Sequence, residues 1–508
     1  MRKKSAGFYN AIERFGNKIP EPFSFFLILI VIVLVASFLL SLIGFSDINP
    51  ATGEEVKVYN MLSKSGLVYI LTSAVSNFTN FTVMCMTLST MLGMAVAEKT
   101  GFFEILMRNI VLSAKGADKV VILIFCFVAV LADITNGPGC IIMPLLGGVV
   151  WSAMGRNPIA GLLCGYAGVM SAFSSNLMLS TTDITSTGFT QKAAEILDPN
   201  YVANASMGWF FQAVAVLPMV LATYFVTIKI VEPRLGPAKN RTTSIDNLEV
   251  TDAQKRGLKI AGIAELIYVL LVVVMTVPKS GWLRMEDGTL LNGKSPFFSA
   301  LVFLLTLFFF IPGFTFGIAT GKIKNIKDLV KMFNEGISSM SGFIVLCFIM
   351  SQFMAYFTKT NIGTLIAIKG ANALTASGLP FVLICIIYIF FCGVMNLLMG
   401  SASAKYGVLA PVFVPMFMLM GYSPSVAQVA YRIGDAFTNP ISPTFAYMAM
   451  LLAAVQKEDK EAGLGTVISN LMPYTIVSGI ILIGMFAIWT ALAIPYGPGE
   501  VLHYVLGG

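Results

Sequence analysis

The chain has 508 residues, of which 56% are hydrophobic and 12% are charged, and its mean hydropathy is +0.82. A soluble protein carries about 25% charged residues, and here the shortage of charge holds nearly from end to end. This excludes a soluble domain with one anchor and indicates a polytopic membrane protein. We attribute the net charge of +7 to the distribution of Lys and Arg in the loops, which reflects membrane topology. We expect no nucleic-acid partner, because no basic run with interleaved aromatic residues occurs.

The chemistry-bearing residue types argue against an enzyme. All seven cysteines lie in apolar segments without a CxxC pair, so neither a zinc site nor a disulfide framework is indicated. His503, the single histidine, lies in the C-terminal tail, which argues against histidine-based catalysis or a transition-metal site. No Walker A, GxSxG or HExxH motif and no nucleophile–base constellation is visible. We therefore expect no enzyme, and ATP is not the evident energy source.

The first membrane half, 23–230, follows a cytoplasmic N-terminal segment, 1–22. A spanning helix is predicted over 23–45. The later apolar runs of this half are 66–97, 120–132, 159–180 and 207–230. The run that starts at Val120 ends in ADITNGPG and resumes as CIIMPLLGG, and such residues break a helix. A re-entrant or discontinuous element is expected there, and residues 184–206 look amphipathic or loop-like.

A polar segment, 231–258, is predicted as a cytoplasmic linker to the second half, 259–508. The predicted spans of this half are 259–278, 296–320, 342–357, 380–399 and 465–494. Lys- and Arg-rich loops are assigned to the cytoplasm. The sequence therefore predicts an all-α polytopic protein of the bacterial cytoplasmic (inner) membrane, surrounded by lipid, with about nine transmembrane helices plus two re-entrant helical hairpins.

One stretch, 396–443, is as apolar as a span yet holds charged residues and several glycines and prolines. A charge at the bilayer centre costs about 3 kcal/mol or more, and broken backbone at that depth needs protein or a water-filled cavity. The first half shows a similar order of features around 136–183: a helix break, a proline, a Gly-x-x-Pro turn, then Asn and Asp. We interpret this as an internal inverted repeat with a substrate and ion site at its interface.

Arg432 has two readings from the sequence. Its planar guanidinium fits a carboxylate, so it is a candidate clamp for a small anionic organic substrate. Alternatively it forms a salt bridge with Asp435, three residues on along a helix. The two readings are compatible if the substrate exchanges with Asp435 as the partner of Arg432.

Four polar residues are candidates for coupling-ion binding. Asp183 could bind a proton or a sodium ion, or it could cap the next helix. Asn136, Asn176 and Asn439 lie at helix breaks, where amide and freed carbonyl oxygens suit sodium, although each alone could simply form a turn.

The GSAS motif holds Ser401 and Ser403, which are either substrate contacts or small residues for close helix packing. Packing is the favoured reading for Ser401. Lys405 follows at once and could snorkel to an interface, so its role is left open.

The chain resembles the AbgT family of p-aminobenzoyl-glutamate transporters in motifs that run from one end to the other. They are ERFGNKIPEPF, GRNPIAGLLCGYAGV, the TTD after SSNL, VEPRLG, IPYGPG and the long run APVFVPMFMLMGYSPSVAQVAYRIGDAFTNPISP. The resemblance implies a homodimer with nine spanning helices and two helical hairpins per subunit, and a bowl-shaped aqueous cavity.

The resemblance further implies uptake of p-aminobenzoyl-glutamate, a folate breakdown product, coupled to a sodium or proton gradient by symport or antiport. Efflux of sulfonamide-type antimetabolites by proton antiport is the alternative. The family's functional residues fall here on Asp183, Ser403, Pro424, Arg432 and Asp435.

Two departures from the family pattern are visible. Tyr406 stands where the family usually has tryptophan; tyrosine still stacks on an aromatic ring but adds a hydroxyl. Asn136-Gly137 stands where a Ser-Asp pair is common, which removes a carboxylate. An ion channel and an intramembrane enzyme are the alternatives from other classes, and the enzyme is disfavoured because no catalytic constellation is visible.

Overall fold

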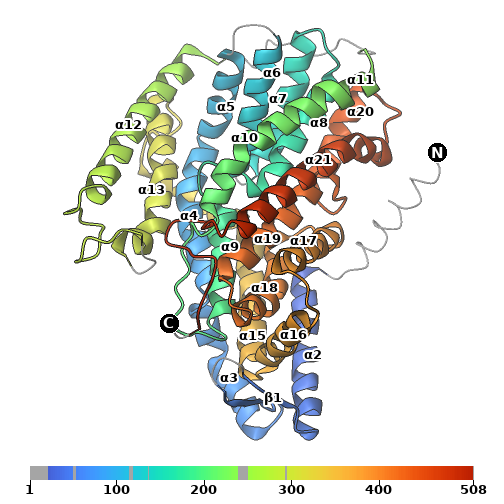
Figure 1. Ribbon diagram of the computed structural model, residues 1–508. Coiled ribbons are helices and arrows are strands. Elements are labelled where there is room, and N and C mark those ends of the chain that lie inside the picture. The colour runs from blue at the N-terminus through green and yellow to red at the C-terminus, as the bar shows by residue number, and fades with distance from the viewer. Residues whose placement is uncertain are drawn as a thin grey trace.

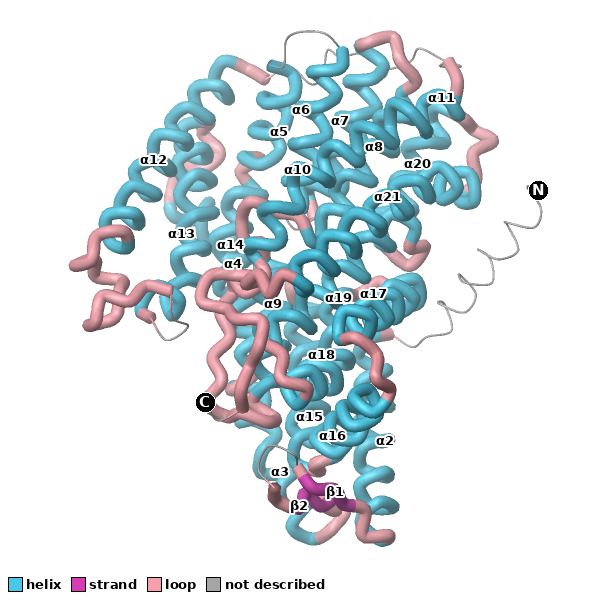
Figure 2. The backbone as a smooth tube through the Cα atoms, in the orientation of Figure 1, coloured by secondary structure: helices cyan, strands magenta, loops and turns pink. Residues whose placement is uncertain are grey.

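The computed structural model describes residues 21–49, 53–113, 118–135, 137–237, 250–291 and 295–506. Within these residues the chain is nearly all helical, and its one sheet is a small antiparallel pair, β1 (Ser46–Ile48) and β2 (Glu55–Lys57), at one end of the molecule (Figure 2). The predicted segment 1–22 lies almost wholly outside the described residues, as does Asn136.

Nine spans in the described part of the chain are long and apolar enough to cross a membrane, when α3 and α4 count as one and α10 is taken with its extension. They are α2 (Pro22–Leu42), α3 (Lys64–Thr79) with α4 (Thr82–Lys99), α10 (Trp209–Val226), α12 (Asp252–Thr276), α13 (Pro296–Ala319), α15 (Ser341–Lys359), α17 (Phe381–Leu398), α18 (Ala402–Leu419) and α21 (Leu464–Ala491). The predicted all-α class with about nine spans is confirmed.

Shorter helices complete the bundle. They are α5 (Phe102–Ser113), α6 (Asp118–Leu131), α7 (Pro138–Ala153), α8 (Pro158–Ser171), α9 (Thr181–Ala194), α11 (Glu232–Leu235), α14 (Ile326–Ser339), α16 (Ile362–Ala376), α19 (Pro424–Thr438) and α20 (Ala446–Glu458). Figure 1 shows α12 and α13 side by side at one flank. Only three of the 25 residues of α12 are buried, as suits a helix that faces lipid.

The first helix break follows α6. The chain continues as a 3-10 turn, η1 (Ala132–Thr135), and re-enters as α7. Gly137 precedes α7 with φ 144°, which an L side chain rarely adopts, and Pro138 takes the first helical position, where its missing N–H costs nothing. The sequence prediction of a discontinuous element is confirmed.

A second break lies at 399–401, between α17 and α18, and a hairpin follows each of the two breaks. The turn after α7 has Gly155 at φ 70°, and the turn after α18 has Gly421 at φ 83°. Two residues later Asn157 and Ser423 cap α8 and α19, each followed by a proline at the first helical position. The Gly-x-x-Pro spacing seen in the sequence is therefore one capped turn used twice.

The element order repeats, and the copies are inverted. The α7–α8 turn joins α11 through Arg156, whose Nε lies 2.7 Å from Glu232 Oε1. The α18–α19 turn joins the C-terminal segment, where Ser423 Oγ donates to Glu500 Oε2 at 3.1 Å. In Figure 1, α11 and the C-terminus lie toward opposite ends of the molecule. The two hairpins thus point in opposite directions, as an inverted repeat requires.

Two sequence predictions need correction. The run 66–97 is two helices, because the chain breaks at Asn80 and Phe81 between α3 and α4. Residues 184–206 are only partly loop: 184–194 belong to α9 (Thr181–Ala194), most of whose side chains are buried, whereas 195–206 are turns and loop. The many Ser and Thr residues of α9 lower its hydropathy, but the helix packs between α4 and α18, to which Thr185 and Thr190 are hydrogen-bonded.

Candidate functional site

Asp183 is placed by the start of α9. Ser180 caps this helix, and Asp183 returns a bond to the Ser180 backbone, which completes a capping box. Its Oδ2 accepts from Ser180 N at 2.7 Å and Ser180 Oγ at 2.9 Å, and its Oδ1 accepts from Gln212 Nε2 at 2.7 Å. Asp183 therefore helps to cap α9, as one reading of the sequence proposed, and its Oδ1, which accepts from Gln212, has a second acceptor position for another role.

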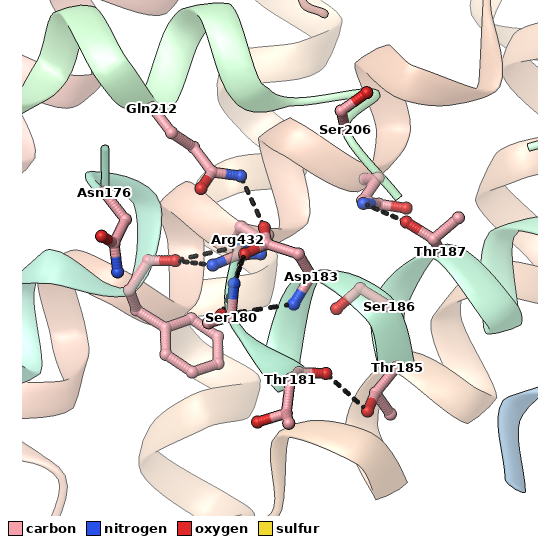
Figure 3. Close-up of polar contacts among 12 residues, drawn as sticks. Asn176, Ser180, Thr181, Asp183, Thr185, Ser186, Thr187, Ser206, Gln212 and Arg432 are labelled. Atoms are coloured by element: carbon pink, nitrogen blue, oxygen red, sulfur yellow. Dashed lines mark hydrogen bonds and ion pairs between the residues drawn. The ribbon is translucent and has the colours of Figure 1, made fainter. Parts of the chain in front are cut away.

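That second role is an ion pair with Arg432 of α19. Arg432 donates from Nη1 to Asp183 Oδ1 and from Nε to the Phe173 carbonyl at 2.9 Å. Figure 3 shows Gln212, Ser180 and Arg432 converging on Asp183. Both side chains of the pair are almost completely buried, at 2% and 0% exposure. Removal of one partner would leave the other charge buried and uncompensated.

Asp435 has a different cation from the one expected. The sequence reading that paired Arg432 with Asp435 is wrong, because Lys405 Nζ lies 2.8 Å from Asp435 Oδ1. Tyr431 donates to Asp435 Oδ2 at 3.1 Å. Lys405 does not snorkel: it is buried, and it also donates to Asn396 of α17. Partners from other helices thus outweigh the local helix spacing.

Asn439, at the end of α19, joins this network. Asn439 begins the 3-10 turn η5 (Asn439–Ile441), its Oδ1 accepts from Asn396 Nδ2 at 2.7 Å, and its Nδ2 donates to the Met170 carbonyl at 3.4 Å. Asn176 lies apart from these contacts: its Oδ1 accepts from Met178 N at 3.3 Å, and its buried Nδ2 has no partner among the described residues.

A cavity of about 210 Å³ lies between α9, α18, the turn after α8 that holds Phe173, and the break before α18 at Gly400. Ser403 and Tyr406 line it, together with hydroxyl and aromatic side chains, among them Thr181, Thr182, Thr185, Ser186, Phe173, Phe189, Phe343 and Phe445. The Tyr406 ring stacks on Tyr431 with centroids 4.3 Å apart, and its hydroxyl is 2.7 Å from Thr190 Oγ1. Pro424 does not line this cavity; it is the first residue of α19, in the outer turn.

A second, smaller cavity of about 100 Å³ is lined by residues of the first break and of η5, with Asp133 of η1 facing it beside Asn439. The two cavities share Phe173, Thr182 and Phe445 as lining residues. Of these groups the sequence reading assigned no role to Asp133, which it treated as part of a helix break, nor to Gln212. A carboxylate within an otherwise apolar run was the available signal for Asp133.

These features define a class of protein. A multi-pass helical bundle with two inverted halves, helices broken at mid-bundle, and buried charges beside a cavity is the architecture of a membrane transporter. The chain belongs to the AbgT transporter family, whose sequence model matches residues 7–504. The family resemblance in the motifs is thereby confirmed, and so is a multi-pass protein of the bacterial cytoplasmic membrane.

Three relatives document the similarity. The p-aminobenzoyl-glutamate transport protein of Escherichia coli (strain K12) is 35% identical over 503 residues, which are 98% of this chain and 97% of the relative. The crystal structure of the Alcanivorax borkumensis YdaH transporter has a TM-score of 0.89 at 31% identity, covering 94% of this chain and 100% of that one. The structure of Neisseria gonorrhoeae MtrF, described among antimetabolite efflux pumps, has a TM-score of 0.90 at 37% identity, covering 97% and 100%.

Proposed function

We propose that this chain is an ion-coupled secondary transporter of p-aminobenzoyl-glutamate or of a related aryl-glutamate or dicarboxylate. The observation that carries the proposal is the cavity of about 210 Å³, whose aromatic and hydroxyl lining lies beside two buried cations, Arg432 and Lys405. An aryl ring suits the aromatic lining, and a carboxylate suits a guanidinium. The name of the Escherichia coli relative supports this substrate.

Phe173 separates the cavity from the guanidinium. The Arg432 Cζ atom lies 5.1 Å from the centroid of the Phe173 ring, and Phe173 lines both cavities. Because Arg432 is only 2% exposed, a substrate carboxylate reaches it only after Phe173 turns aside. We infer that this conformation is closed between Arg432 and the cavity, and that substrate then competes with Asp183 for the guanidinium.

The predicted site residues accordingly have different roles in this proposal. Ser403 and Tyr406 contact substrate directly, Arg432 and Asp435 act through the two buried ion pairs, and Pro424 sets the turn that holds α19. For coupling, the sodium or proton site predicted at Asp183, Asn136, Asn176 and Asn439 is retained as part of the proposal. A homodimer in the lipid bilayer also belongs to it.

Efflux is the second candidate, because a structural relative is described among antimetabolite efflux pumps. The same lining accommodates an aromatic sulfonamide. Inside-out and right-side-out vesicles loaded with labelled substrate separate import from export by the direction of net movement.

Selectivity tests the substrate class. Uptake of labelled p-aminobenzoyl-glutamate into proteoliposomes is measured against an excess of unlabelled p-aminobenzoyl-glutamate, of glutarate or of a sulfonamide. We expect strong competition by the first and weaker competition by the simple dicarboxylate. Transport of glutarate with no transport of p-aminobenzoyl-glutamate would overturn the proposal.

A further inference from the structure

Asp133 is the carboxylate of the site region for which the described structure supplies no cation. It lies on η1, between the apolar helices α6 and α7, and its Oδ2 is buried with no hydrogen-bond partner among the described residues. A buried carboxylate oxygen without a partner makes the charged form of the group costly. Within a membrane protein such a residue is a functional-site hypothesis by default.

The other carboxylates of the site are already occupied. Asp183 accepts from Ser180, Gln212 and Arg432. Asp435 is paired with Lys405. A cation that arrived at either would have to displace a protein donor, whereas Asp133 offers an oxygen with none.

The surroundings of Asp133 form a small recess within the bundle, called the chamber below. The cavity of about 100 Å³ that it lines is also lined by Thr182, Asn439, Tyr447 and Cys140. A volume of this size exceeds the ~10–15 Å³ that one water needs, so it has room for a small cation with a few waters. The hydroxyl and amide groups are the hard oxygen ligands that such ions prefer.

The charged groups around the chamber favour one positive charge. Arg432 and Asp183 are the charged side chains within electrostatic reach of Asp133, and they are bonded to each other. From α7 and α20 the chamber receives the thiol of Cys140 and the hydroxyl of Tyr447. Among the described groups that face it, Asp133 therefore remains the uncompensated charge.

We propose that Asp133 is the binding site of a monovalent cation, sodium or a proton, and that this cation is the coupling ion. The assignment rests on the proposed ion-coupled transport for its meaning, but the site itself is defined by binding. Asn439, in the turn η5 after α19, lines the same chamber. Occupation would therefore act at once on η1 of the first half and on η5 of the second half, next to the cavity that holds the substrate.

The test measures cation binding without transport. The thermal unfolding of purified full-length protein in detergent is followed as NaCl replaces choline chloride at constant ionic strength and pH. In a second series, pH is varied in choline buffer. The variants are Asp133→Asn, Asp133→Glu and, as a matched control, Glu265→Gln, because Glu265 of α12 also has buried oxygens without a partner but lies outside the chamber.

We expect Na⁺ to stabilise the wild type and Glu265→Gln if sodium is the ion; if it is the proton, both should show a part of the pH dependence of the unfolding midpoint that Asp133→Asn removes. Asp133→Asn should weaken the response by at least about tenfold in apparent affinity, and Asp133→Glu should retain a shifted response. An unchanged response in Asp133→Asn, or none in the wild type under either series, would overturn the site. A cation response with no uptake of p-aminobenzoyl-glutamate would leave the site standing and refute the proposed substrate instead.

Discussion

The pairing of Arg432 with Asp183 makes a quantitative prediction. Both side chains are at most 2% exposed, and loss of one member of a buried pair costs about 3–5 kcal/mol. Asp183 keeps its bonds from Ser180 and Gln212 when Arg432 is replaced. We therefore expect Arg432→Met to lower the free energy of unfolding by about 3 kcal/mol, the lower end of that range.

A double-mutant cycle isolates the pair from its surroundings. Asp183→Asn together with Arg432→Met removes both charges, so the double variant should be more stable than the sum of the single losses by about 2–3 kcal/mol. In the control cycle, Asp435→Asn replaces Asp183→Asn. Because Asp435 is paired with Lys405, its coupling to Arg432 should be about 0.5 kcal/mol, as for neighbours on one helix.

The assay is equilibrium unfolding of purified protein in mixed micelles of increasing SDS fraction. Coupling with Asp435 as large as that with Asp183 would refute the pairing. The double variant should also fail to transport although it is folded, which separates the role of Arg432 in function from its role in stability.

Three further predictions concern packing, substrate contact and pH. Gly434→Ala should lower the free energy of unfolding by about 2–3 kcal/mol, because the added Cβ would lie 2.5 Å from Cys392 Cβ, between α19 and α17. The control is Gly465→Ala, whose Cβ would meet nothing within 4 Å, and thermal unfolding compares the two variants. Tyr406→Phe should lower the free energy of unfolding by about 1 kcal/mol and should change the KM for substrate more than kcat. An unchanged KM counts against substrate contact at the ring hydroxyl. Burial raises the pKa of Glu500, in the C-terminal segment beyond α21, from 4.5 to about 7, so the folded state holds a proton that the unfolded chain releases. The free energy of unfolding should therefore fall by about 2 kcal/mol between pH 4.5 and 7. Glu500→Gln should abolish this pH dependence, which is measured as the unfolding midpoint across the same pH range.

Much of the fold was predictable because its causes are local. Spans follow from runs of apolar residues, and the breaks follow from residues that cannot continue a helix, such as Gly137 and Pro138. The Gly-x-x-Pro turns are recognisable because glycine supplies a positive φ and proline starts the next helix. The helix α9 was missed for the opposite reason: its hydroxyl residues look like those of a loop until their protein partners are known.

The charge pairs were not predictable from spacing. Asp183 and Arg432 are separated by 249 positions, and no helical periodicity connects them. Lys405 and Asp435 likewise meet across α18 and α19. The sequence did identify the residues, since charges within apolar runs are costly and are kept near partners. Their partners depend on how the two inverted halves pack, which is a property of the whole fold.

The most direct test of the account is uptake of labelled p-aminobenzoyl-glutamate into proteoliposomes under an imposed sodium gradient or an imposed proton gradient. Wild type is compared with Arg432→Ala and with the control Arg234→Ala, since Arg234 is an exposed residue of α11. The account predicts accumulation under one gradient, retained in the control and abolished in Arg432→Ala. No accumulation in the wild type under either gradient, or full accumulation in Arg432→Ala, would contradict it.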